Sequence, residues 1–197
     1  MGTKSQEAVI NSMQSLNSLD LELAEKVIQE DEIIDDYELK IEKCASQLIA
    51  RQNPTAGDMR LVTSCIKIAI DLERMSDLAV DIANMVKCLE QEHTKPFSNI
   101  LKMGEIGEDM LEQALKAFET MDEKLARSTA LKDDMIDQLF HETQTKLIEM
   151  MVEDRSMINN ASYLLFVLRY LERMGDHACN ICESVVYMAS GERVDLN

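Results

Sequence analysis

Carboxylate side chains recur at helical spacing in this chain, and they are its best candidates for binding a cation. Glu73, Asp77 and Asp81 are four residues apart, which would place them within about 80° of one another on a helix. Like charges at this spacing destabilise a helix by roughly 0.2–0.5 kcal/mol per pair, so we expect an arginine or a metal cation to neutralise them. Carboxylate oxygens suit Mg²⁺, Mn²⁺ and iron, and the spacing does not choose among these ions.

A second acidic ridge precedes the first along the chain. It comprises Asp31, Asp35, Glu38 and Glu42, which lie on one side of another expected helix beside an apolar band. The stripe formed by Glu73, Asp77 and Asp81 is expected to face away from the packed seam of its helix. Two interpretations fit these ridges: solvated acidic faces paired with arginines, or metal sites.

Both ridges have a copy about a hundred residues later, which indicates an internal duplication. Asp31-Glu-Ile-Ile-Asp35 recurs as Asp133-Asp-Met-Ile-Asp137, and Leu72-Glu-Arg-Met-Ser-Asp77 recurs as Leu171-Glu-Arg-Met-Gly-Asp176. The second copy is less acidic, because Phe140 replaces Glu38. A chance acidic pattern would not recur at equivalent positions, so the repetition favours metal binding over a solvated face.

Hydrophobic periodicity assigns three helices to each repeat and predicts an all-α fold of two tandem three-helix bundles. A seam of apolar residues at alternating threes and fours runs along each third helix and predicts its core face. The chain has only 6 Gly and 2 Pro, too few for the many turns of a sheet-based fold. The predicted helices span 5–29, 31–51 and 55–90 in the first repeat (5–90), and 98–127, 131–153 and 156–190 in the second (98–190), with a linker at 91–97.

The composition excludes several classes of partner. A formal net charge of −17 repels a phosphate backbone, so nucleic acid is not an expected partner. The longest apolar run, 163–168, is far shorter than the ~20 residues that span a bilayer, so no membrane insertion is expected. The five cysteines are an odd number within helical patterns, and no signal peptide precedes them, which predicts reduced thiols in the cytoplasm.

Three stretches of the chain resemble the PhoU family of phosphate-uptake regulators. The most specific is Glu172-Arg-Met-Gly-Asp-His-Ala-Cys-Asn-Ile181, which has a degenerate copy in the first repeat. The segments 20–35 and 53–60 also match, so the resemblance covers nearly the whole chain. It implies two pseudo-symmetric three-helix bundles whose acidic motifs hold metal clusters on the bundle surface.

The resemblance also implies a set of metal ligands and partners. Family members are negative regulators of phosphate uptake and of the phosphate-starvation response, they contact the phosphate ABC transporter and its sensor histidine kinase, and they are often homodimers. The candidate ions are iron, manganese, magnesium and zinc. The implied ligands are Asp31, Asp35, Glu73 and Asp77 in the first repeat and Asp133, Asp137, Glu172 and Asp176 in the second, with Asp81, Asn180 and Glu183 as additional ligands.

Other functional classes make different demands on the sequence. A di-iron carboxylate enzyme needs two Glu-x-x-His motifs and two further inward-facing glutamates, whereas this chain offers only Glu90-Gln-Glu-His93. No catalytic residues are therefore predicted. A metal-free helical interaction module, and an accessory protein of a sodium-coupled or low-affinity phosphate transporter, remain open alternatives.

Overall fold

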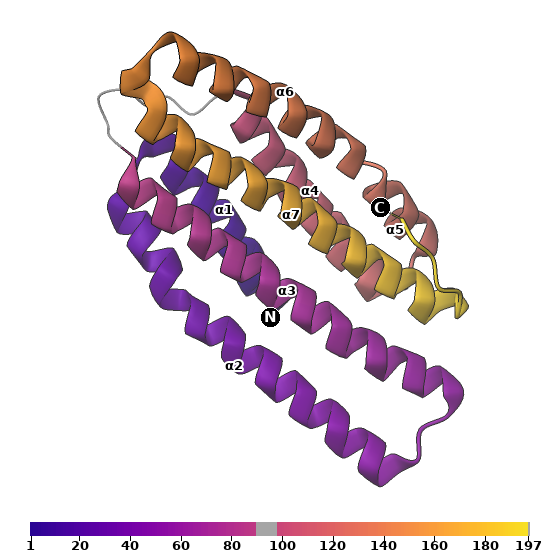
Figure 1. Cartoon of the computed structure of the whole chain (residues 1–197). Helices are drawn as coiled ribbons and strands as arrows, with labels where there is room; N and C mark the ends of the chain where they lie inside the picture. The colour runs from indigo at the N-terminus through magenta and orange to yellow at the C-terminus, as the bar shows by residue number, and fades with distance from the viewer. Residues whose placement is uncertain (90–97, 197) are drawn as a thin grey trace.

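The protein is helical throughout the residues that its computed structural model describes, 1–89 and 98–196 (Figure 1). The predicted linker at 91–97 lies outside the described residues. The all-α prediction is confirmed. The elements are α1 (Gly2–Ser18), α2 (Leu21–Gln52), α3 (Ala56–Cys88), α4 (Ser98–Thr120), α5 (Glu123–Ala130), α6 (Asp133–Glu153), the 3₁₀ turn η1 (Arg155–Met157) and α7 (Ile158–Ser190).

The third helices of the two repeats, α3 and α7, lie side by side at the centre of the molecule (Figure 1). Helix α2 flanks α3 at one edge, and α6 flanks α7 at the opposite edge. Helices α1 and α4 pack against α3 and α7 respectively, and also against each other. The central pair therefore joins the two repeats through one continuous apolar core.

The apolar seam predicted on the third helices forms most of this core. On α7 every seam residue from Leu164 to Val185 is buried, and on α3 the seam is buried from Ile68 to Val86. The two seam residues nearest the start of α3, Leu61 and Cys65, are only partly buried. None of the described helices is both long enough and apolar enough to cross a membrane.

The prediction that the first helix reaches residue 29 is wrong. The chain turns at Leu19, whose φ of 53° is left-handed, and Asp20 then caps α2 by accepting hydrogen bonds from Glu22 N and Leu23 N, each at 3.0 Å. Met121 and Asp122 make the same turn in the second repeat, with φ 53° at Met121. An aspartate that caps a helix outweighed the continuous apolar pattern across the turn.

The second repeat also differs from the first in a way that the sequence did not predict. The counterpart of α2 is divided into α5 and α6 by a tight turn at Leu131 and Lys132, where Lys132 N donates to Thr129 O and Met135 N donates to Lys132 O. As a result Asp133 is the first residue of a helix, whereas its counterpart Asp31 lies inside the continuous helix α2.

Candidate metal and interaction site

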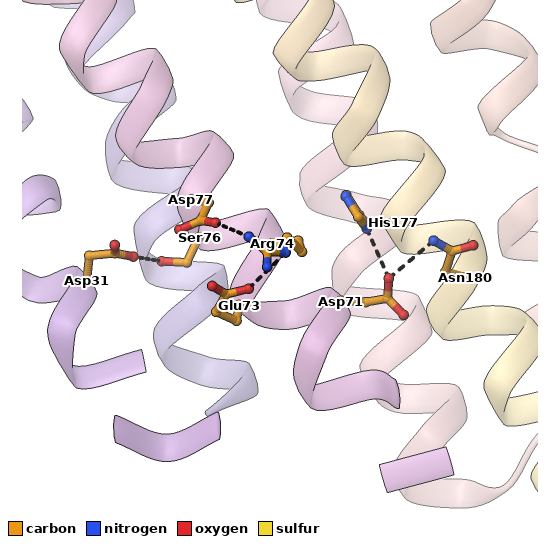
Figure 2. Close-up of polar contacts among 8 residues, drawn as sticks. All are labelled: Asp31, Asp71, Glu73, Arg74, Ser76, Asp77, His177 and Asn180. Carbon is orange, nitrogen blue, oxygen red and sulfur yellow. Dashed lines mark hydrogen bonds and ion pairs between the residues drawn. The ribbon is translucent and has the colours of Figure 1, made fainter. Parts of the chain in front are cut away.

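In the first repeat, carboxylates from α2 and α3 meet where the two helices pack together (Figure 2). Ser76 Oγ donates a 2.6 Å hydrogen bond to Asp31 Oδ1 and so ties α3 to α2. On the same turn of α3, Arg74 Nη1 lies 2.8 Å from Asp77 Oδ2, and Arg74 Nε lies 3.3 Å from Glu73 Oε2. An arginine therefore provides part of the charge compensation that this ridge requires.

The negative charge of this ridge is only partly compensated, because its carboxylates are buried and repel one another. Burial, followed by the charge of Asp77, raises the pKa of Glu73 to about 7 despite the neighbouring Arg74. Burial also raises the pKa of Asp31; its Ser76 hydrogen bond opposes this rise, and Asp35 and Asp77 add to it. The first-repeat carboxylates therefore act on one another across α2 and α3.

In the second repeat the equivalent site has no hydroxyl, because Gly175 stands where Ser76 stands in the first. A Cβ placed on Gly175 would come within 2.1 Å of Asp133 Oδ1, so only glycine leaves room for this carboxylate. Asp133 is 4% exposed, and its Oδ1 accepts no hydrogen bond from any described residue. The glycine thus admits a carboxylate but gives it no partner.

The second-repeat carboxylates repel one another in this buried position. Burial, then the charges of Asp137, Asp176 and Glu172, raise the pKa of Asp133 to about 7. Burial and Asp176 raise the pKa of Glu172, while Arg169, which pairs with Glu172 Oε1, lowers it. The arginine comes from the preceding turn of α7, so it occupies a different position from Arg74 in the first repeat.

The spacing predicts that the acidic stripe of α3 faces away from the packed seam of its own helix, and the structure adds that α2 packs beside part of this stripe. The side chains of Glu73 and its counterpart Glu172 are only 13% and 16% exposed. Each third helix is central and packs on more than one side, so the face opposite its α1 or α4 seam contacts α2 or α6. Residue spacing along one helix indicates where its own core seam lies but not what covers its other faces.

Of the three predicted additional ligands, Asn180 and Glu183 have partners outside the two clusters, whereas Asp81 interacts with the charge of Asp77. Asn180 Nδ2 donates to Asp71 Oδ1 at 3.2 Å, and His177 Nδ1 lies 2.9 Å from the same oxygen, so this group joins α3 to α7 (Figure 2). Glu183 Oε1 accepts from Leu196 N at 2.9 Å near the end of the described chain. The charge of Asp77 helps burial to raise the pKa of Asp81, and Arg173 on α7 opposes it.

The sequence prediction did not identify Asp71, Ser76, Gly175 or Arg169 as parts of these groups. A signal was available for two of them, because Ser76 and Gly175 are the one difference between the copies Glu-Arg-Met-Ser-Asp and Glu-Arg-Met-Gly-Asp. Asp71 and Arg169 carry no such signal, since their partners lie on a different helix or one helical turn away from the motif.

The carboxylate oxygens of the two clusters are suitable ligands for a cation, but the side chains do not surround a common point where a cation could bind. Asp133 Oδ1 and Glu172 Oε2 are buried and accept no hydrogen bond from the described residues, so each of these two carboxylates has an oxygen available to a ligand. Within the same described ranges, however, no group of three or more His, Cys, Asp or Glu side chains is arranged so that it could hold a metal ion.

The family model named PhoU domain matches the chain twice, at residues 1–86 and 100–185, and so covers both repeats and both acidic clusters. The chain belongs to the PhoU family. The phosphate-specific transport system accessory protein PhoU homolog of Clostridium acetobutylicum is 38% identical over all of this chain and 91% of the relative. The homolog of Aquifex aeolicus is 40% identical over 96% of this chain and 86% of the relative.

Solved PhoU structures show the same fold along the whole chain. The crystal structure of PhoU from Pseudomonas aeruginosa superposes with a TM-score of 0.94 at 33% identity and covers 98% of this chain and 93% of that one. The phosphate transport system regulatory protein PhoU from Streptococcus pneumoniae gives a TM-score of 0.92, also at 33% identity, over 98% of this chain. The resemblance stated from the sequence motifs is therefore confirmed.

Proposed function

We propose that this PhoU-family protein is an accessory protein of a phosphate-specific transport system that lowers phosphate uptake and represses the phosphate-starvation response. The accessory role is supported by similarity over the full chain to proteins named phosphate-specific transport system accessory protein PhoU homolog. In this proposal it acts in the cytoplasm as a homodimer, and its helical surfaces contact the phosphate ABC transporter and its sensor histidine kinase.

The regulatory role is tested by deleting the gene in its source organism. Phosphate uptake and starvation-induced transcription should both rise in phosphate-replete medium and return to normal on complementation. Co-purification of the protein with the transporter and the kinase tests the partners, and light scattering tests the dimer. Unchanged uptake in the deletion strain, together with an effect on a sodium-coupled phosphate transporter, would instead support the alternative accessory role.

We further propose that cations bind the two acidic clusters and reduce the repulsion within them. The ligands would be Asp31, Asp35, Glu73 and Asp77 in one cluster and Asp133, Asp137, Glu172 and Asp176 in the other. Buried carboxylate oxygens without hydrogen-bond partners and the raised pKa values of Glu73 and Asp133 support this proposal. A bound cation would supply positive charge and fix the relative positions of the paired helices; the proposal requires side-chain movement to close the site.

Elemental analysis of untagged protein purified without chelator tests the cation proposal. Replacement of Asp31, Asp35, Glu73 and Asp77 by the corresponding amides should remove the metal bound by the first repeat and preserve the helical circular-dichroism spectrum. Unchanged metal content in this variant would contradict the assigned site. Metal-free protein that also fails to bind added iron, manganese, magnesium or zinc would support the metal-free interaction module, which the absence of a closed ligand group among the described residues favours.

A further inference from the structure

A groove of about 630 Å³ lies between the last turns of α2 and the first turns of α3, where their connecting turn forms one end of the molecule (Figure 1). Its apolar wall includes Leu48 of α2, Leu61 and Val62 of α3, and Pro54 of the turn between them. Leu48 is 41% exposed, whereas Val62 is 8% exposed. All of the lining residues lie between Cys44 and Val62, so the groove is separate from both acidic clusters.

The turn that closes this groove is held by hydrogen bonds of its own. Asn53 ends α2 with a left-handed φ of 44°, and Thr55 is the N-cap of α3. Asp58 Oδ2 accepts a hydrogen bond from Thr55 N at 3.0 Å and another from Thr55 Oγ1 at 2.7 Å. A groove whose walls are already ordered loses less conformational entropy when a partner binds, and this favours binding.

The two charged residues that line the groove, Arg51 and Asp58, differ in how their charges are compensated. Asp58 lies in the first turn of α3, where Thr55 and the helix dipole stabilise its negative charge. Arg51 is exposed and forms no ion pair with any residue of 1–89 or 98–196. The groove therefore offers a partner an uncompensated positive charge.

The end of the molecule that carries the groove also has an excess of basic residues. Segment 43–67 contains four basic residues and one acidic residue, although the chain as a whole has a net charge of −17. The equivalent segment of the second repeat, 145–166, contains two basic and three acidic residues. An acidic partner is therefore repelled by most of the protein and attracted at this end. The four basic residues are Lys43, Arg51, Arg60 and Lys67.

We propose that this groove is the docking site for an acidic amphipathic helix of a partner protein. The apolar face of that helix packs on Leu48, Leu61 and Val62, and its glutamates or aspartates lie beside Arg51. Helix-in-groove recognition of this kind uses apolar anchors at helical spacing, and the charges around them fix the orientation of the bound helix.

The shape of the site favours a peptide helix over a membrane surface. Lipid surfaces are bound by apolar side chains that enter the bilayer, whereas here the apolar side chains line a hollow that accepts side chains from outside. The docking proposal does not depend on the proposed role in phosphate uptake, because it uses only the shape and charge of this groove. Peptide binding and the phenotype of a deletion strain can therefore fail independently.

The test uses the whole protein and a fluorophore-labelled, acetylated and amidated helical peptide of about 15 residues, with leucines along one face and glutamates beside them. Fluorescence anisotropy at low and high salt measures the affinity, which should fall as the salt concentration rises. Two control peptides should bind about tenfold more weakly: one with serine in place of each leucine, and one with glutamine in place of each glutamate.

Cys44 reports which surface the peptide covers, because it is exposed and lines the groove. At saturation the peptide should slow maleimide modification of Cys44 by about tenfold, and it should leave Cys88, which is exposed at the other end of α3, unaffected. Protection of Cys88 in place of Cys44, or equal binding of the serine peptide, would overturn the proposal.

Variants of the apolar wall and of the charge test the two parts of the site separately. Leu48→Ser should weaken peptide binding by about tenfold, whereas Leu39→Ser, at a more exposed residue of the same helix outside the groove, should leave it unchanged. Arg51→Glu should also weaken binding by about tenfold, and Arg51→Lys should retain most of it.

Arg155→Glu is the matched control for the charge variants, because Arg155 is exposed at the equivalent turn of the second repeat. It should leave peptide binding unchanged. Circular dichroism of each variant checks that the helices are intact. Full binding by either Leu48→Ser or Arg51→Glu would overturn the proposal.

Other occupants give different results with the same variants. Self-association of the protein that Leu48→Ser and Arg51→Glu both abolish would assign the groove to a second copy of this chain. Binding to vesicles of phosphatidylglycerol and phosphatidylcholine that requires Leu48 and Arg51, without binding of the peptide, would assign it to a membrane surface. Either result would overturn the proposal.

Discussion

The two acidic clusters occupy equivalent places, yet they handle buried charge in different ways. In the first repeat, Ser76 of α3 donates to Asp31 of α2, and Arg74 pairs with Glu73 and Asp77 of its own helix. In the second repeat, Gly175 provides space but no donor for Asp133, and Arg169 pairs with Glu172. The exchange of serine for glycine thus explains why Asp31 has a hydroxyl donor and Asp133 has none among the described residues.

The difference shows that an internal repeat can keep carboxylates at equivalent positions although the free-energy cost of burying their charges differs. The carboxylate that loses its hydroxyl partner is also the more buried one, and its pKa is raised to about 7. Asp133 partly benefits from its place in the first turn of α6, where the helix dipole favours negative charge. That benefit is too small to offset its burial among Asp137, Asp176 and Glu172.

The largest expected effect comes from removing the unsatisfied charge. Asp133→Asn in chelator-treated protein should raise the free energy of unfolding at pH 8 by about 3 kcal/mol, because folding at this pH buries a carboxylate that is already ionised in the unfolded state. The wild-type protein should lose this stability as pH rises from about 4 to about 7, since the folded state holds the proton longer than the unfolded state. Urea titrations at pH 4.5 and pH 8 measure it.

The neighbouring exposed Asp134 provides the control for that experiment. Asp134→Asn should change the free energy of unfolding by less than about 0.5 kcal/mol at either pH. A gain for Asp133→Asn that is equally large at pH 4.5 would mean that the effect does not arise from ionisation.

Closing the space beside Asp133 should have the next largest effect. Gly175→Ala places a methyl group against Asp133 Oδ1 and Ile136, so it should destabilise the protein by about 2 kcal/mol even though alanine favours a helix. The double variant Asp133→Ala with Gly175→Ala should recover most of that loss in a double-mutant cycle from urea unfolding. Additive effects of the two substitutions would show that the two side chains do not interact.

Removing the hydroxyl in the first repeat should make the two clusters more alike. Ser76→Ala deletes the donor to Asp31 and should lower the free energy of unfolding at pH 8 by about 1 kcal/mol. It should also raise the pKa of Asp31, because the Ser76 hydrogen bond lowers it in the wild-type protein. Carboxyl NMR titration measures the pKa directly, and an unchanged value would contradict the role assigned to Ser76.

The smallest expected effect comes from the half-exposed Arg74. Arg74→Gln should cost about 0.5 kcal/mol, because its ion pairs are accessible to water and are screened by salt. The more informative change is a higher pKa of Glu73, which Arg74 holds down. NMR titrations of the variant and the wild type, compared at low and high salt, measure the pKa of Glu73 and its dependence on salt. Lys40→Gln, which removes an exposed ion pair with Asp36, is the matched control.

The sequence was sufficient to predict the repeats, the all-helical class, the core seams and the family resemblance. Each of these depends on residue type and on spacing along a helix. The acidic residues Asp31, Glu73, Asp133 and Glu172 were identified in the same way. The turn at Asp20 was missed although its signal, an aspartate that caps the helix, was present in both repeats.

Only the tertiary structure decided which of these acids share a site and how deeply they are buried. The positions of Asn180 and Glu183 follow from the packing of α7 against α3 and the chain end, and helical angles on one helix contain no information about that packing. Likewise, the free oxygen of Asp133 depends on a glycine of another helix that passes close to it. Residue spacing determines the face of a helix, whereas burial and pKa depend on the helices that cover that face.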